Sequence, residues 1–169
     1  MKRVAGKLIP WRRKSKIKKL DGDLDTAMSF AVVGSSEKFG KKFHAYKVYK
    51  LLKEMGSHPY PVAAGLADLE KDAVFPSLLS LPQKVDAVIP CLPAEFSLSI
   101  VREAKEAGIN KVWFQNRTLS PEAFEFCQNN EMEITEGCVL KFKEFSNLAR
   151  FVHPCYWHGK TILRKKKYL

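Results

Sequence analysis

The stretch from Ser29 to Ser36 constrains the fold of this chain more than any other. Four apolar residues, 30–33, end abruptly at Gly34, and two hydroxyl residues, Ser35 and Ser36, follow. A helical pattern begins soon afterwards, near residue 42. A buried strand that passes through a glycine turn toward a helix leaves free backbone N–H groups near the positive end of the helix dipole. The pattern therefore predicts a strand–turn–helix unit that can hold a phosphate group.

The rest of the chain alternates between strand-like and helix-like patterns. Apolar residues recur with helical spacing over 42–55, 95–107 and 120–129. We expect Ala45, Val48, Leu52 and Met55 of the first helix, and Phe96, Ile100, Ala104 and Ala107 of the second, to face the core. Gly56 and Gly108 are placed to end these two helices, and Ser120 before Pro121 is a favoured helix start. The remaining strands are expected at 60–63, 73–75, 85–91, 111–114 and 131–135. Strand and helix alternating over short connections predict an α/β protein whose mainly parallel sheet is covered by helices.

Charge divides the chain into three parts. The net charge is +11, but residues 1–28 hold nine Lys or Arg and three Asp, whereas 29–149 hold 14 basic and 15 acidic residues. We therefore expect a basic N-terminal extension at 1–28, a nearly neutral domain at 29–145 and a basic C-terminal extension at 146–169. No apolar run reaches the ~20 residues of a membrane span, and the start lacks the apolar block of a secretory signal. Four scattered cysteines favour reduced thiols and a cytoplasmic protein.

The residues after the glycine turn fit an anionic ligand. Lys38, Lys41, Lys42 and His44 crowd the segment before the helix, where positive charge opposes the helix dipole unless an anion is bound. An ordinary solvated helix start explains the same residues equally well. The stretch lacks a full G-x-G-x-x-G motif, and no acidic residue follows the second strand to bind a ribose hydroxyl, so NAD is disfavoured.

Several motifs, in this order, resemble those of one protein family. They are Val-Gly-Ser-Ser at 33–36, Val-Tyr-Lys-Leu-Leu at 48–52, Tyr-Pro-Val at 60–62, Val-Phe-Pro-Ser-Leu at 74–78, Leu-Pro-Gln-Lys-Val-Asp at 81–86, Val-Trp-Phe-Gln at 112–115 and Glu-Gly-Cys-Val-Leu at 136–140. From about residue 29 to 145 the chain is similar to the small bacterial and archaeal coenzyme A-binding proteins. The resemblance implies a Rossmann-like three-layer sandwich with a mainly parallel five-stranded sheet, related to the nucleotide-binding domain of the succinyl-coenzyme A synthetase alpha chain.

The resemblance also implies coenzyme A binding at the carboxyl ends of the strands. Gly34, Ser35 and Ser36 match the family's Gly-Ala-Ser phosphate turn and Lys38 the basic residue after it, Pro93 falls in the loop that crosses the ligand, and Trp113 and Gln115 match a Trp-x-Gln pair. This chain departs from the family in two places. Val62-Ala63-Ala64 stands where Val-Asn-Pro is usual, and Asn116-Arg117 stands where a glycine is usual.

Two cysteines are placed at the same expected edge. Cys91 ends one predicted strand and Cys138 follows another, so either thiol could meet the thiol of coenzyme A. Buried cysteines that act as small apolar side chains are the simpler interpretation, and we favour it. Cys138, His153, Cys155 and His158 do not have the spacing of a compact zinc site, so no metal is expected. No arrangement of catalytic residues is evident.

These observations favour non-catalytic binding of coenzyme A or an acyl-coenzyme A. The alternative is a degenerate Rossmann-like platform whose basic tails bind nucleic acid or an acidic partner, because Trp11 beside Arg12 and Arg13 combines an aromatic ring with cations. An enzyme that uses the bound thioester would need a catalytic residue that the sequence does not identify. The acyl group and the oligomeric state are left open.

Overall fold

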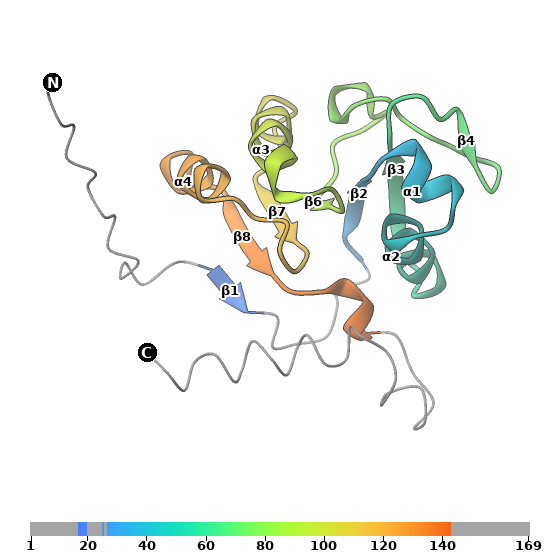
Figure 1. The fold of residues 1–169 in the computed structure, drawn as a ribbon, viewed down its shortest axis with the longest axis horizontal. Helices are drawn as coiled ribbons and strands as arrows, with labels where there is room; N and C mark the ends of the chain where they lie inside the picture. The colour runs from blue at the N-terminus through green and yellow to red at the C-terminus, as the bar shows by residue number, and fades with distance from the viewer. Residues whose placement is uncertain (1–16, 20–24, 26, 143–169) are drawn as a thin grey trace, which may run out of the picture.

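A parallel β-sheet forms the centre of the protein (Figure 1). The structure is a computed structural model that describes residues 17–19, 25 and 27–142. All the strand pairs of the main sheet are parallel, in the order β1-β8-β7-β6-β2-β3. Its strands are β1 (Ile17–Lys19), β2 (Ser29–Val33), β3 (His58–Val62), β6 (Ala87–Pro90), β7 (Lys111–Phe114) and β8 (Glu133–Glu136). The predicted Rossmann-like α/β fold with five parallel strands is confirmed. A sixth strand, β1, joins the edge at β8 from within the segment 1–28 and was not predicted.

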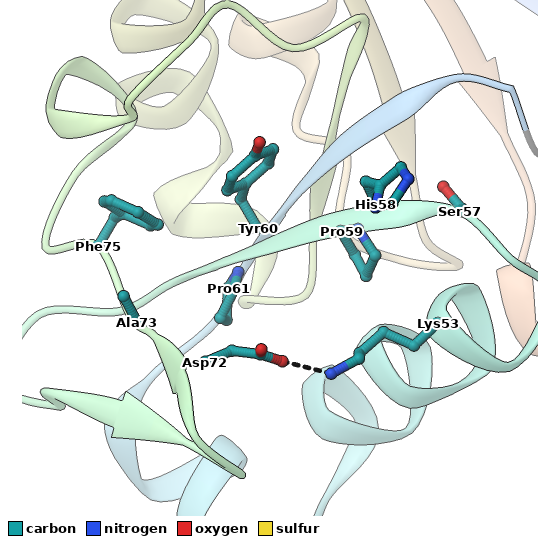
Figure 2. Close-up of a pocket in the computed structure, with 9 residues that line it drawn as sticks. All are labelled: Lys53, Ser57, His58, Pro59, Tyr60, Pro61, Asp72, Ala73 and Phe75. Carbon is teal, nitrogen blue, oxygen red and sulfur yellow. Dashed lines mark hydrogen bonds and ion pairs between the residues drawn. The ribbon is translucent and has the colours of Figure 1, made fainter.

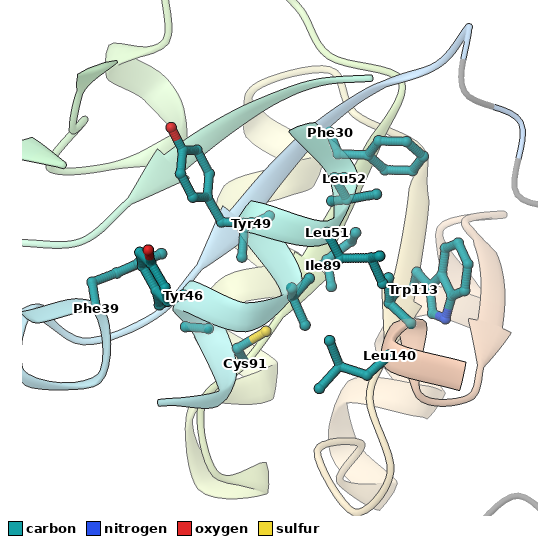
Figure 3. Packing of buried hydrophobic residues seen from close by; sticks show 14 of the residues in the cluster. Phe30, Phe39, Tyr46, Tyr49, Leu51, Leu52, Ile89, Cys91, Trp113 and Leu140 are labelled. Carbon is teal, nitrogen blue, oxygen red and sulfur yellow. The ribbon is translucent and has the colours of Figure 1, made fainter. Parts of the chain in front are cut away.

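Helices cover both faces of this sheet (Figure 1). Helices α1 (Ser36–Gly40) and α2 (His44–Glu54) lie on one face, and α3 (Ser97–Glu106) and α4 (Pro121–Asn129) lie on the other. The described chain also contains three short 3₁₀ helices: η1 (Leu78–Ser80), η2 (Ala94–Phe96) and η3 (Val139–Phe142). Successive side chains of a strand point to opposite faces, so Phe30 and Val32 pack under α2 while Ala31 and Val33 pack under α3. Figure 3 shows the cluster on the α2 face.

The predicted helix ends are confirmed where the residue type determines the backbone. Gly56 and Gly108 have φ of 84° and 74°, the left-handed conformation that glycine adopts without a steric penalty. Ser120 caps α4, and its side-chain oxygen accepts a hydrogen bond from the amide of Ala123 at 3.2 Å. These residues are sufficient to predict where a helix begins or ends, because each acts within one turn of the helix.

Two helix predictions need correction. The helix expected from residue 42 begins at His44, because Lys42 has φ of 55° and cannot continue a right-handed helix. The short helix α1 precedes it and was not predicted. Phe96 was expected to face the core, but it ends η2 and is 46% exposed. The 3₁₀ turn before α3 changes the rotation per residue, so the side-chain phase of α3 does not extend back to Phe96.

The strand expected at 73–75 is also wrong. Instead, β4 (Asp68–Leu69) and β5 (Asp72–Ala73) form an antiparallel hairpin, and only Phe75 bridges to Val62 of β3. Glu70 and Lys71, which join β4 to β5, have φ of 52° and 76°, as a two-residue hairpin turn requires. The hairpin packs on α2, where the hydroxyl of Tyr46 bonds to Glu70 and that of Tyr49 to Asp72.

Candidate functional site

The carboxyl ends of the parallel strands meet at one edge of the sheet, and three of the predicted site residues directly follow strands there. Gly34 follows β2, Cys91 follows β6 and Gln115 follows β7. Strands β2 and β6 are neighbours in the sheet, although the chain leaves β2 toward α2 and leaves β6 toward α3 on the opposite face. This is a topological switch point, where open α/β sheets have the crevice that binds ligands.

The glycine turn was expected to offer free backbone N–H groups from Gly34 onward, but in the structure they begin at Ser35. The amide of Gly34 donates to the carbonyl oxygen of Val62 at 2.9 Å, so it belongs to the sheet. Ser35 caps α1, and its side-chain oxygen accepts from the amide of Lys38 at 3.2 Å. Within the described residues, the amides of Ser35, Ser36 and Glu37 have no protein acceptor, because they belong to the first turn of the helix. These three N–H groups are the available anion donors of the turn.

Gly34 is required by packing rather than by the approach of a ligand. A Cβ atom at this position would lie 2.7 Å from Cβ of Ala45 and 2.9 Å from Cε2 of Phe39. Both neighbours are completely buried between α1, α2 and the sheet. A side chain at position 34 would therefore point into the core. Its absence lets α2 pack closely against the end of β2.

The two predicted lysines have different surroundings. Lys38 is partly buried, and its Nζ donates to the carbonyl oxygen of Cys91 at 3.2 Å, so its positive charge lies between the ends of β2 and β6. Lys42 is exposed, with its Nζ 5.7 Å from the ring centroid of Tyr46. The structure thus brings Lys38 into the switch-point region and places the ammonium of Lys42 near the ring of Tyr46.

His44, Gln115 and Val139 form a buried polar contact beside Lys38. Oε1 of Gln115 accepts from the amide of Val139 at 3.0 Å and lies 3.4 Å from Nε2 of His44. Burial lowers the pKa of His44, and the charges of Lys38 and Lys47 lower it further, whereas the contact with Gln115 opposes the shift. His44 is therefore a neutral imidazole at neutral pH. From the sequence, His44 is recognisable only as one of the basic residues near the turn.

The other predicted binding residues belong mainly to the core. Val62 and Ala63 are 3% and 2% exposed, and Trp113 packs edge-on against Phe30 with its Nε1 donating to the carbonyl oxygen of Gly137 at 2.9 Å. Pro93 is exposed and precedes η2. Of these residues, Pro93 alone presents a solvent-exposed side chain at the edge of the sheet.

The cysteines at this edge are buried thiols. Cys91 and Cys138 are 3% and 6% exposed, and both belong to the cluster under α2. Cys91 is labelled in Figure 3. Burial raises the pKa of Cys91 to about 12, although the nearby charge of Lys38 opposes the shift. Cys91 is therefore a protonated thiol that packs as a small apolar side chain.

A hollow of about 270 Å³ lies along the outer edge of β3, and none of the predicted site residues lines it (Figure 2). Pro59 and Pro61 of β3 contribute to it, and so does Lys53, which is paired with Asp72. Proline has no N–H group to donate, so the two prolines are suited to an edge strand. The hollow is distinct from the carboxyl edge.

Comparison with known proteins identifies the family of this chain. A family model described as a CoA binding domain matches residues 28–143, well over half of the chain. The chain belongs to the CoA binding domain family. Residues 29–36, which form β2 and its glycine turn, lie near the start of the matched region, and Cys138 lies near its end.

Solved structures share the fold of this CoA binding domain. A conserved hypothetical protein from Pyrococcus furiosus is 27% identical with a TM-score of 0.63, and the match covers 69% of this chain and 99% of that one. A hypothetical protein from Pyrococcus horikoshii is 28% identical with a TM-score of 0.60, covering 66% and 78%. A Thermus thermophilus protein, 23% identical with a TM-score of 0.55 and coverage of 65% and 82%, shares the fold alone.

The remaining sequence predictions concern membrane spans, metal sites and the terminal segments of this CoA binding domain protein. The described residues include no helix that is both long and apolar enough to cross a membrane, and no group of three or more His, Cys, Asp or Glu placed to hold a metal ion. The tails assigned to nucleic acid, 1–28 and 146–169, lie outside the described residues apart from 17–19, 25, 27 and 28.

Proposed function

We propose that this protein binds coenzyme A or an acyl-coenzyme A at the carboxyl edge of its sheet and does not turn the ligand over. The observation that carries the proposal is the set of donors at the switch point. The unpaired amides of Ser35, Ser36 and Glu37 begin α1, and the charge of Lys38 lies beside them. Membership of the CoA binding domain family supports the same ligand.

The phosphate groups of coenzyme A match these donors. A pyrophosphate presents several charged oxygens, which accept strong hydrogen bonds from backbone N–H groups and from a lysine ammonium. The Gly34 amide takes no part, because it is bonded to Val62. Gly34 contributes by letting α2 pack closely, which fixes the position of the three donor amides.

The groups beside the proposed ligand are poor candidates for acyl transfer. Cys91 keeps its proton because burial raises its pKa to about 12, and a thiolate is the form that attacks a thioester. The ammonium of Lys38 is engaged by the Cys91 carbonyl oxygen, and a protonated amine is not a nucleophile. These observations support binding without catalysis.

Calorimetric titration of the purified full chain with coenzyme A tests the binding. We expect saturable heat with one site per chain, and the absence of heat at ligand concentrations near a millimolar would refute it. Incubation with acetyl-coenzyme A, followed by measurement of free thiol over hours, tests the second part. Binding without release of coenzyme A is expected, whereas release that depends on the protein would show an enzyme.

A further inference from the structure

A turn with an arginine at a position that favours glycine follows β7. The amide and the hydroxyl of Thr118 both donate to the carbonyl oxygen of Gln115, at 3.1 and 2.9 Å, and close residues 115–118 into a β-turn. Arg117 has φ of 64°, whereas φ of Asn116 is negative, which is the pattern of a type II turn. The third position of such a turn favours glycine, because a residue with a Cβ atom is strained there. The backbone of this turn does not explain an arginine.

The turn is held firmly at the carboxyl edge of the sheet. Its first residue, Gln115, directly follows β7, and the side chain of Gln115 accepts a hydrogen bond from the amide of Val139 at 3.0 Å. Strand β7 is two strands from β2 in the sheet order. Neighbouring strands are about 4.8 Å apart, so this turn starts about 10 Å from the end of β2, where the phosphate donors lie. Arg117 is exposed, so a ligand can meet its side chain without any movement of the protein.

The guanidinium group of Arg117 has no partner among the described residues. No hydrogen bond, ion pair or ring contact within that part of the chain involves it. Arg102, which is also exposed, differs because its guanidinium lies 5.9 Å from the ring centroid of Phe126. Residues held in strained backbone conformations cluster at ligand-binding and active sites. A strained arginine without a contact inside the protein therefore points to an anionic partner outside the chain.

We propose that Arg117 binds a carboxylate on the acyl group of the bound ligand, so that the protein selects coenzyme A thioesters of dicarboxylic acids. The inference rests on the proposed function, because the phosphates must be held at residues 35–38 for the acyl group to extend toward β7. A planar guanidinium donates two parallel hydrogen bonds to a carboxylate, a geometry that a lysine ammonium does not match. The family usually has a glycine in this turn, which offers no side chain, so the contact is particular to this chain.

The phosphates of coenzyme A suit Arg117 less well than an acyl carboxylate does. The unpaired amides that begin α1 and the ammonium of Lys38 already supply donors for the pyrophosphate at the end of β2. The pantetheine arm separates the pyrophosphate from the thioester, so the acyl group is the part of the ligand that extends farthest from these donors. An uncharged acyl group would leave the cation without a partner.

Matched pairs of thioesters isolate the contribution of the carboxylate. Glutaryl-coenzyme A and pentanoyl-coenzyme A differ only by a terminal carboxylate in place of a methyl group, and malonyl- and propanoyl-coenzyme A form a shorter pair. Calorimetric titration compares the four ligands with the full chain. In at least one pair, we expect the wild type to bind the dicarboxylic thioester roughly 3- to 10-fold more tightly, between the values for an exposed ion pair and a charged hydrogen bond.

Three variants assign this preference to the arginine. Arg117→Gln removes the charge and keeps a side chain in the turn, so we expect it to abolish the preference and to leave the affinity for pentanoyl-coenzyme A unchanged. Arg117→Lys keeps the charge and should retain part of the preference, which should shrink as salt screens the pair. Arg102→Gln, at an exposed position of α3, is the matched control and should behave as the wild type.

Equal affinities within both pairs overturn the inference and leave the proposed function intact, because all four thioesters still bind. A preference that persists in Arg117→Gln also overturns it. Equal weakening of all four ligands by Arg117→Gln overturns it as well, since the arginine would then hold a phosphate common to them all. A wild type that binds none of the four overturns the proposed function together with the inference.

Discussion

The ammonium group of Lys38 donates a hydrogen bond to the carbonyl oxygen of Cys91 at 3.2 Å. The contact joins the helix after β2 to the end of β6, which are the two sides of the switch point. It holds a positive charge at the place where the unpaired amides of Ser35 and Ser36 begin α1. The charge is thus in position before any ligand arrives.

Replacement of this lysine tests the phosphate site. Lys38→Met keeps most of the apolar side chain and removes the charge, so we expect coenzyme A to bind about 10- to 100-fold more weakly, as for a lost charged hydrogen bond. Lys111→Met is the matched control, because Lys111 is exposed at the start of β7, at the opposite edge of the sheet. Titration calorimetry measures both variants. Equal affinities would place the phosphates elsewhere.

Gly34→Ala is expected to lower the free energy of unfolding by about 1–3 kcal/mol, the usual cost of overpacking. The added methyl group would lie 2.7 Å from Cβ of Ala45, inside the core. At Gly40 a Cβ atom meets nothing within 4 Å, so Gly40→Ala is expected to be neutral or to stabilise by up to about 1 kcal/mol. Urea denaturation compares the two. A neutral Gly34→Ala would contradict the packing explanation.

Arg117 occupies a backbone position that favours glycine. Its φ is 64°, and Thr118 closes the turn by donating to the carbonyl oxygen of Gln115 at 2.9 Å. We expect Arg117→Gly to raise the free energy of unfolding by about 1 kcal/mol, because the left-handed conformation strains other residues. Arg102→Gly, in the exposed middle of α3, should lower it by a similar amount. Destabilisation by both changes would show that the Arg117 side chain compensates for the strain.

His44 makes the stability of the protein depend on pH. Burial lowers its pKa below 6.5 in the folded state, so the unfolded chain takes up the proton first as pH falls. The free energy of unfolding should therefore decrease as pH falls below about 6.5, and His44→Gln should reduce this dependence. His58→Gln, at an exposed position of β3, is the control. An unchanged pH profile for His44→Gln would exclude the effect.

The buried thiols should resist alkylation in the native protein. Burial raises the pKa of Cys91 to about 12 and that of Cys127 to about 11, so almost no thiolate is present at pH 8. We expect iodoacetamide to label neither residue within an hour, and to label both in urea, as measured by peptide mass spectrometry. Rapid native labelling of Cys91 would revive the possibility of a mixed disulfide with coenzyme A.

Local patterns explain why much of the fold was predictable. The strand at 111–114 and the helix ends at Gly56, Gly108 and Ser120 follow from residue type and short-range spacing, and the structure confirms them. The hairpin at 68–73 was missed because its position depends on contacts with distant side chains. Tyr49 of α2, for example, bonds to Asp72, and no periodicity within 68–73 indicates that partner.

The sequence by itself determined the strand–turn–helix order and the edge at which the candidate residues gather, because parallel strands all end on the same side. Only the tertiary structure decided which groups at that edge are free. The amide of Gly34 is taken by Val62, Trp113 is buried against Phe30, and Gln115 is left with an unpaired nitrogen. The reason is that a hydrogen bond or a contact between strands depends on residues far apart in the chain, and their pairing is fixed only when the sheet and its covering helices pack together.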